Sequence, residues 1–540
     1  MQFVNPEADR LIPKSVAAIK SWVTRSYAQE QLEIKQQLHS AISTIHFTFD
    51  LWTSPNRLAL LGVVAHYTSE DGLLRHSVLA LKEVHGQHSG ENQAQAFLEV
   101  VDEYQIRNKI GYMMTDNATN NDTMIKEVSR RLKEEGIDYD PTLHRLRCNG
   151  HVINLAVRSF LHGQENQRAL FKKIEKSEEW KTDDAEMAEW RNLGTLGRVH
   201  NVVYFITKTP QRLQTFRKLP GNEDGLSLKR DNKTRWNSWY LMLDWLLKDN
   251  IRAAVDAYCA REKQVERDRL SYSDWENMTK IRNFLKTFFE ITKETEGRES
   301  TLDQILQAMD FLLYEFENNQ KLYKNQGDEY MISCLDAGWT KMKKYYKNTD
   351  RSVAYLAATV LHPSCKWTYF ESAWEPSWVT SARPKLVAFW RNHYKSTAVD
   401  ISSYATSPPS ISKLQSWRMS HTARVPSRAM DELELYLSQP IIPDLENALE
   451  WWLHSAQRKM YPNLSLMAID LLSIPAMSAE PERVFSEAKL TITDDRNRLK
   501  EESINALECL KSWYKSLDRE NEQKKEIENE ARQEDAEMVL

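Results

Sequence analysis

The stretch Ile45-His-Phe-Thr-Phe-Asp50 alternates β-type side chains with polar ones and ends in a carboxylate. Alternation over a short run predicts a β-strand. Leu58–Tyr67 is a second β-rich run, and the turn signal Glu70-Asp-Gly72 separates it from a third run, Leu73–Val84. Because Asp-Gly between two such runs is typical of a hairpin, these segments predict three strands joined by hairpins.

Helices and strands alternate after the hairpins. Glu91–Tyr104 and Thr123–Glu135 have helical periodicity. Lys109–Thr115 is a short strand of the buried type, and Leu143–Cys148 is a fifth strand. Three hairpin-connected strands followed by helix, strand, helix and strand predict an α/β unit with a mixed sheet.

The rest of the chain changes character twice. Strand signals give way to helical periodicity rich in Trp, Tyr and Phe, and a Ser/Pro-containing stretch later interrupts that periodicity. The predicted division is an N-terminal helical segment at 1–42, the α/β fold at 43–165, an all-helical insertion at 166–395, a flexible loop at 396–430, a second helical region at 431–517 and a charged tail at 518–540.

The composition indicates a globular, intracellular chain. Of the 540 residues 41% are hydrophobic and 28% charged, which excludes collagen-like and wholly disordered chains. The five cysteines are scattered and predict neither a disulfide framework nor a Cys-pair zinc site. No apolar run is long enough to span a bilayer, so we expect no membrane partner. The net charge of −5 gives no global signature of nucleic-acid binding.

Two carboxylates follow predicted strands, Asp50 after the first and Asp116 after the fourth. Neighbouring strand ends can bring such side chains to one edge of a sheet. Carboxylate oxygens suit hard divalent cations, and a pair of these supports phosphoryl transfer. The alternative is that each Asp starts a turn or caps a helix, and the residues alone leave the two readings at about even weight.

Five blocks of sequence point to a family. In chain order they are Phe49-Asp-Leu-Trp-Thr-Ser54, Met114-Thr-Asp-Asn-Ala-Thr-Asn120, Arg147-Cys-Asn-Gly-His151, Thr234-Arg-Trp-Asn-Ser238 and Ser478-Ala-Glu-Pro-Glu-Arg-Val-Phe-Ser486. With these blocks the chain resembles a hAT-superfamily DNA transposase of the fungal type over about residues 10–517. The resemblance implies an RNase H-like fold, interrupted by an all-α insertion and completed by a hAT C-terminal dimerisation region at 431–517.

The resemblance also implies a catalytic triad of Asp50, Asp116 and Glu482, which would hold two Mg²⁺ or Mn²⁺ ions. The implied activity is DNA strand cleavage by water, followed by transfer of the 3′-hydroxyl to target DNA. Glu480 and Glu487 are rivals for the third position. Because residues 480 and 482 point about 200° apart on a helix, only one can face the ions. Pro at a first helical position would make Glu480 a cap, which favours Glu482.

Five residues are candidates for DNA contact. Similarity to the family places Cys148 and His151 beside the scissile phosphate, although a packed Cys and a locally bonded His are equally good readings. Trp236 would stabilise an extruded base, with Arg235 and Lys233 on phosphate, unless Trp236 is a core residue. From residue 208 to 235 the chain carries a net charge of +5, which supports DNA backbone contact.

Large apolar side chains in the 431–517 region predict subunit contacts. Such residues are usually intramolecular core, but the family also builds an interface here, so we expect a homodimer or higher oligomer. The predicted contact residues are Trp451, Trp452, Leu471, Leu472 and Phe485.

The expected partners are transposon ends and target DNA, and the expected location is the nucleus. Relatives that move DNA usually begin with a BED-type zinc finger, whereas no cysteine precedes Cys148, so we expect no finger and no zinc in this chain. A non-catalytic, dimerising DNA- or protein-binding factor descended from a transposase is the alternative function.

Overall fold

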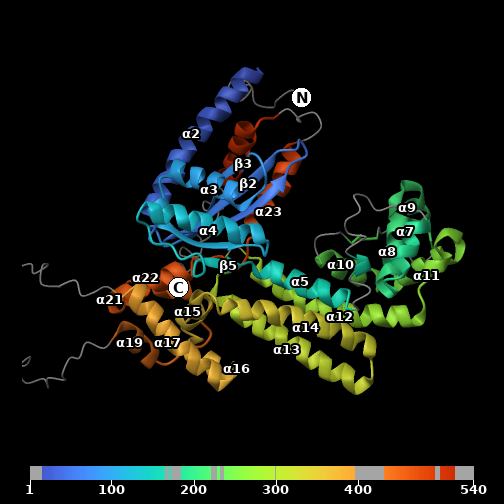
Figure 1. Cartoon of the computed structure of the whole chain (residues 1–540). Coiled ribbons are helices and arrows are strands. Elements are labelled where there is room, and N and C mark those ends of the chain that lie inside the picture. Colours follow the sequence, from blue (N-terminus) through green and yellow to red (C-terminus); the bar gives the residue numbers. More distant parts are fainter. Residues whose placement is uncertain are drawn as a thin grey trace, which may run out of the picture. The chain divides into compact units, whose positions relative to one another are not determined.

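The chain forms two compact units (Figure 1). Unit 1 joins residues 1–146, 301–303 and 351–540, and unit 2 joins residues 147–300 and 304–350. The computed structural model describes residues 15–163, 169–171, 184–219, 228–231, 236–297, 299–395, 431–492 and 499–516. The predicted loop at 396–430 and the predicted tail lie outside the described residues. No described helix is both long and apolar enough to cross a bilayer.

Unit 1 is the mixed α/β unit. Its first part contains the helix α2 (Val16–Ser40), the strands β1 (Ile45–Thr53), β2 (Ala59–Thr68) and β3 (Leu74–Glu83), then α3 (Gly90–Tyr104), η1 (Arg107–Lys109), β4 (Ile110–Thr115), α4 (Thr119–Glu134) and β5 (Arg145–Arg147). Its second part is helical: α15 (Val353–Leu361), α16 (Lys366–Ala373), α17 (Pro376–His393), α19 (Glu432–Ser438), α20 (Ala448–Leu453), α21 (Ser455–Met460), α22 (Pro462–Leu471), α23 (Ala479–Thr491) and a last helix at 501–516.

The five strands form one mixed sheet in the order β3-β2-β1-β4-β5. β1 pairs antiparallel with β2 and parallel with β4, and β2 pairs antiparallel with β3. The hairpin between β2 and β3 turns at Gly72, whose φ of 83° is a conformation that glycine adopts without strain. The prediction of a mixed α/β sheet with RNase H-like character is confirmed, and each predicted strand is found.

Helices cover both faces of the sheet, so β1 and β2 are buried along most of their length. On one face Phe47 and Phe49 of β1 contact Phe97 of α3, with ring centroids 5.0 and 5.8 Å apart. On the other face Trp52 of β1 stacks on Phe485 of α23 at 5.4 Å. The core of unit 1 therefore joins segments more than 400 residues apart in sequence.

The last helix covers the open edge of β3. Four of its side chains, spaced by four residues and therefore on one helix face, form hydrogen bonds with the β3 main chain. The pairs are Trp513 Nε1 to Val78 O (2.9 Å), Cys509 Sγ to Leu79 O (3.7 Å), Leu81 N to Asn505 Oδ1 (2.8 Å) and Glu83 N to Glu501 Oε1 (3.0 Å). We call this set the edge ladder. It satisfies main-chain groups that a neighbouring strand would otherwise bind.

Unit 2 is helical in its described residues. It contains α5 (Asn149–Leu161), α7 (Asp184–Arg191), α8 (Thr195–Lys208), α9 (Pro210–Arg217), α10 (Asn237–Leu246), α11 (Asp249–Arg261), η2 (Lys263–Asp268), α12 (Tyr272–Thr295), α13 (Asp303–Gln326) and α14 (Glu329–Thr349).

The boundaries of this unit differ from the predicted insertion at 166–395. α5 packs on α14, where Gly338 lies so close to Phe160 and Phe316 that a Cβ at Gly338 would meet both side chains within 3.0 Å. α15–α17 instead belong to unit 1, since Trp452 Nε1 donates to Leu361 O (2.7 Å) and Tyr394 OH donates to Asp470 Oδ2 (3.2 Å). Helical periodicity alone does not reveal which core a helix joins.

Candidate active site and DNA-contacting residues

Asp50 and Asp116 lie on the same face of the sheet, at neighbouring strands. Thr48 of β1 is paired with Met114 of β4, so two residues later Asp50 and Asp116 occupy matching positions of the parallel pair. Asp116 is one residue beyond the end of β4. Because side chains alternate along a strand, Asp50 shares the face of Trp52 and Phe485. Both carboxylates are partly buried.

The turn after β4 is fixed by hydrogen bonds around Asp116. Asp116 Oδ1 accepts from Ala118 N (2.9 Å) and from Asn121 Nδ2 (2.6 Å). Arg145 Nη2 donates to the Asp116 main-chain oxygen (2.6 Å), and Arg145 Nε pairs with Asp122 Oδ1 at 3.1 Å. Oδ1 of Asp116 thus stabilises the turn, which is the role that the alternative interpretation gave to this Asp. Oδ2 accepts no hydrogen bond from the described residues. Sequence reasoning missed Arg145, since an Arg in a short strand carries no signal of its own.

The two glutamates of α23 point in different directions. Glu480 is buried, accepts a hydrogen bond from Arg483 Nη1, and has Oε2 at 3.9 Å from His76 Nε2 of β3. The helix begins at Ala479 after Ser478, so Glu480 lies inside the first turn and the prediction that it caps the helix is wrong. Glu482 is only partly buried.

The position of Phe485 orients the helix on the sheet. A Cβ built at Gly62 of β2 would come within 2.8 Å of the Phe485 ring, and Gly62 is the strand partner of Asp50. Glu480 lies on the β3 side of this contact. Glu482 projects about 200° away from Glu480 around the helix, so the two side chains lie on different faces of α23.

The three carboxylates do not converge tightly enough to surround a single ion. In the described part of the chain one group of three potential ligands has its ligand atoms within 4.8 Å of one another, and that group does not include Asp50, Asp116 or Glu482. A pair of ions about 3.5–4 Å apart spans a wider set of oxygens. Asp50, inside β1, and Asp116, just beyond β4, offer only oxygen ligands, which suit hard divalent cations.

Three histidines form a row on the same face, two of them buried (His46 and His66) and one partly buried (His76). His46 is paired with His66, and His66 with His76. Tyr112 N donates to His46 Nδ1 (3.1 Å), so His46 carries its proton on Nε2 and donates it to Asp470 O (2.8 Å). Burial lowers the pKa of His46 to about 3 and holds the pKa of His66 well below its usual range. Burial raises the pKa of Asp470 to about 6.

These pKa shifts predict that unit 1 loses stability as the pH falls from about 6.5. The unfolded histidines bind protons below their usual pKa of about 6.5 and the folded ones do not, so each contributes a slope of about 1.4 kcal/mol per pH unit. Asp470 has the opposite sign, and its contribution is lost as the pH rises through about 6. The combined contribution of the two histidines to the pH dependence of the unfolding free energy exceeds that of the one carboxyl. We therefore expect the urea midpoint to fall from pH 7.5 through 6.5 to 5.5. His66→Gln should flatten the dependence, and an unchanged slope would contradict this assignment.

The predicted DNA-contacting residues have different environments in unit 2. His151 is partly buried in the first turn of α5, and its DNA contact stays a prediction. Cys148 and Trp236 are both buried at 3% exposure in this structure, and their contact with DNA stays a prediction. Trp236 packs into the helical core, with its main-chain N bonded to Asn154 Oδ1 (3.3 Å). Lys233 and Arg235 lie outside the described residues.

A different set of basic and aromatic side chains does reach the surface of unit 2. Lys208 and Arg230 lie over the Tyr204 ring, at 4.9 and 5.2 Å from its centroid. Lys229 and Lys248 lie over the Trp245 ring, at 4.9 and 3.6 Å. Since residues 229 and 230 are adjacent in sequence, the two groups are continuous. We call these six residues the Tyr204–Trp245 patch.

The predicted dimerisation residues are mostly internal. Trp452, Leu471 and Leu472 are fully buried, and Phe485 is 6% exposed. Their side chains fill the core of unit 1, so the prediction that these four offer a subunit surface is corrected. Trp451 is partly buried against Trp452, with ring centroids 4.8 Å apart. Among the described residues of this region the exposed large apolar side chains are Ile441, Met460, Leu466, Leu490 and Tyr514.

Comparisons with known families match three segments of the chain. Residues 48–139 match the ZBED1 RNase-like domain and residues 146–284 match the ZBED1 RNase-like helical domain. Residues 432–514 match the hAT family C-terminal dimerisation region. These segments correspond to the sheet, to most of unit 2 and to the helices from α19 onward.

Individual relatives extend the match over most of the chain. A Talaromyces stipitatus protein provisionally named transcriptional regulator tpeD is 27% identical over 89% of this chain and 55% of its own length. A Zea mays protein provisionally named AC transposase is 22% identical over 95% of this chain and 62% of its own length. The zinc finger BED domain-containing protein DAYSLEEPER of Arabidopsis thaliana is 21% identical over 95% of this chain and 69% of its own length. The chain thus spans 55–62% of the first two relatives.

Proposed function

Because the chain carries the RNase-like, helical and C-terminal dimerisation regions of the hAT superfamily, we propose that it acts on DNA as a metal-dependent transposase. The proposed chemistry is strand cleavage and strand transfer by the split triad of Asp50, Asp116 and Glu482. The observation that carries it is the matching position of Asp50 and Asp116 on the sheet face that α23 covers.

The proposed cofactor is a pair of Mg²⁺ or Mn²⁺ ions. When bound, such ions activate the attacking oxygen and stabilise the leaving oxygen of a phosphoryl transfer. The residues of the chain would position this centre: Arg145 and Asn121 hold the Asp116 turn, and Phe485 fixes α23 over Gly62. Preorganised ligands of this kind need little rearrangement during the reaction.

The proposed partners are DNA and further copies of the chain, and the proposed location is the nucleus. The dimerisation match supports a homo-oligomer. The Tyr204–Trp245 patch supports DNA binding, since its cations can neutralise phosphates and its two partly exposed rings can stack on bases. The relatives named as regulators and BED-finger proteins favour a second function, a non-catalytic factor that binds DNA or protein.

One assay separates these two functions. Full-length protein is incubated with DNA that carries the terminal repeats flanking its own gene, with Mn²⁺ or with chelator. Cleavage that requires the ion supports the transposase. Retained DNA binding with no cleavage by the wild type would overturn the enzyme proposal and leave the binding factor.

Neutralising the Tyr204–Trp245 patch is expected to weaken DNA binding in a salt-dependent way. In the triple variant Lys208→Ala, Lys229→Ala, Lys248→Ala, each lost phosphate contact should lower the slope of log K against log[salt] by about 0.9. The measurement is fluorescence anisotropy with duplex DNA between about 50 and 200 mM salt.

The matched control removes three exposed lysines of the same unit, Lys286, Lys321 and Lys324. We expect its slope to equal that of the wild type. Equal slopes for both triple variants would show that DNA binds elsewhere.

A further inference from the structure

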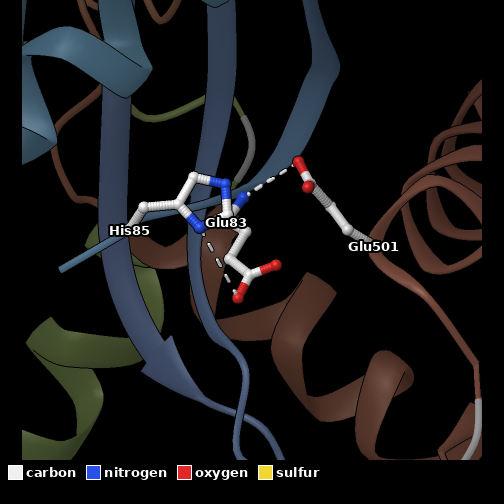
Figure 2. A group of neighbouring side chains, drawn as sticks. All are labelled: Glu83, His85 and Glu501. Carbon is white, nitrogen blue, oxygen red and sulfur yellow. Dashed lines mark hydrogen bonds and ion pairs between the residues drawn. The ribbon is translucent and has the colours of Figure 1, made fainter.

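Three side chains converge where β3 ends (Figure 2). Glu83 is the last residue of β3, His85 follows two residues later, and Glu501 is the first residue of the last helix. One ligand atom from each lies within 4.8 Å of the other two. Within the described ranges no other group of three His, Cys, Asp or Glu side chains meets this condition.

The negative charge of this group is only partly balanced by a protein cation, because Lys82 pairs with Glu99 and also interacts electrostatically with Glu501. The His85 imidazole lies next to the Glu83 carboxylate, with His85 Nδ1 at 3.9 Å from Glu83 Oε1. The neighbouring Lys82 directs its Nζ to Glu99 instead, at 3.2 Å. Among the described residues neither Glu83 nor Glu501 forms an ion pair with Lys or Arg. Two carboxylates are therefore held together beside a neutral or singly charged ring.

The contacts around the group hold it in place before any ion arrives. Glu83 N donates to Glu501 Oε1 (3.0 Å), which is the first contact of the edge ladder. Glu83 is positioned by the β2–β3 pairing with Leu60. His85 is mostly exposed, with 79% of its side chain accessible, so an ion can enter from solvent.

We propose that Glu83, His85 and Glu501 bind a Zn²⁺ ion. Two carboxylate oxygens and one imidazole nitrogen are ligands that Zn²⁺ accepts, and a water molecule would complete a four-coordinate site. Imidazole disfavours Mg²⁺ and Ca²⁺, which take oxygen ligands. The expectation that this chain holds no zinc rested on its cysteines, and this site uses none.

The bound ion would fasten the last helix to the sheet. Glu501 begins the helix whose next three contacts run along β3, so an ion at Glu501 would restrain the N-terminal end of that helix. The proposed role is structural and is separate from the Asp50–Asp116 centre.

The test is zinc binding by full-length, tag-free protein after chelator treatment. All proteins carry Asp116→Asn, so that the proposed catalytic centre contributes little. Isothermal titration compares Zn²⁺ with Mg²⁺ on the parent and on the His85→Ala, Glu501→Gln and His88→Ala variants. Glu501→Gln keeps an oxygen that can accept from Glu83 N, and His88 is an exposed histidine of the same loop outside the group.

We expect one Zn²⁺ per chain in the parent and in His88→Ala, and at least about tenfold weaker binding in His85→Ala and Glu501→Gln. Zn²⁺ should also slow amide exchange in residues 501–516 of the parent, and Mg²⁺ should not. Equal zinc affinity in all four proteins, or no zinc binding by the parent, would overturn the site. Neither result depends on DNA cleavage, so this proposal and the transposase proposal fail independently.

Discussion

Asp116→Asn is expected to lower Mn²⁺-dependent DNA cleavage by at least about a thousandfold, because an amide is a weak ligand for a hard cation at a two-metal centre. The amide keeps one oxygen that can accept from Ala118 N, so the turn should survive. Cleavage is measured on terminal-repeat DNA, together with the urea midpoint and DNA affinity. Both of these should remain near the wild-type values.

The glutamates of α23 provide the matched comparison. Glu482→Gln should abolish cleavage as Asp116→Asn does. Glu480→Gln should retain most of the cleavage while losing some stability, since Glu480 is held by Arg483 and lies near His76. If the two variants exchanged these behaviours, Glu480 would be the third carboxylate.

Gly62→Val is expected to reduce cleavage about ten- to hundredfold without unfolding the sheet. Its Cβ would come within 2.8 Å of the Phe485 ring, so that ring must shift, and we expect the helix that carries Glu482 to shift with it. Overpacking of this kind costs about 1–3 kcal/mol, which corresponds to that range of rates. The measurement is the cleavage rate at saturating Mn²⁺.

A second substitution checks the cause. Phe485→Leu removes the ring and should restore part of the rate in the Gly62→Val background. A double variant as slow as Gly62→Val alone would show that the defect does not arise from this contact.

The strands of the sheet were predictable because their signals are local. Alternation in Ile45–Asp50 and the turn at Gly72 act over a few residues, and β1 and the β2–β3 hairpin follow from them. Within the helical segment predicted at 1–42, the described residues form one helix, α2. No Gly or Pro interrupts residues 16–40, and Tyr27 stacks on Trp513 with centroids 5.4 Å apart.

Side-chain environments were less predictable, since they depend on distant segments. Trp452 and Phe485 are large aromatic residues of the kind found at interfaces, but they contact Leu361 and Gly62 of the same chain. Trp236 likewise is a core residue, while Tyr204 and Trp245 of unit 2 are partly buried beneath basic side chains. A single sequence gives the number of large apolar side chains and does not say which of them meet. The family resemblance identified Asp50, Asp116 and Glu482 as the candidate carboxylates. The pairing of β1 with β4 explains why the first two are neighbours.

The edge ladder also sets the order in which a newly made chain can complete its fold. Trp513 is synthesised 435 residues after Val78, the strand residue that it covers. At about 5–20 residues per second a ribosome needs about 20–90 s to cover that distance. Throughout this interval the nascent sheet has an open edge that other strands can pair with. During this period of synthesis the β3 edge is unprotected. Whether the chain folds or aggregates then depends on a chaperone that covers the edge, or on the rapid removal of other chains that could pair with it.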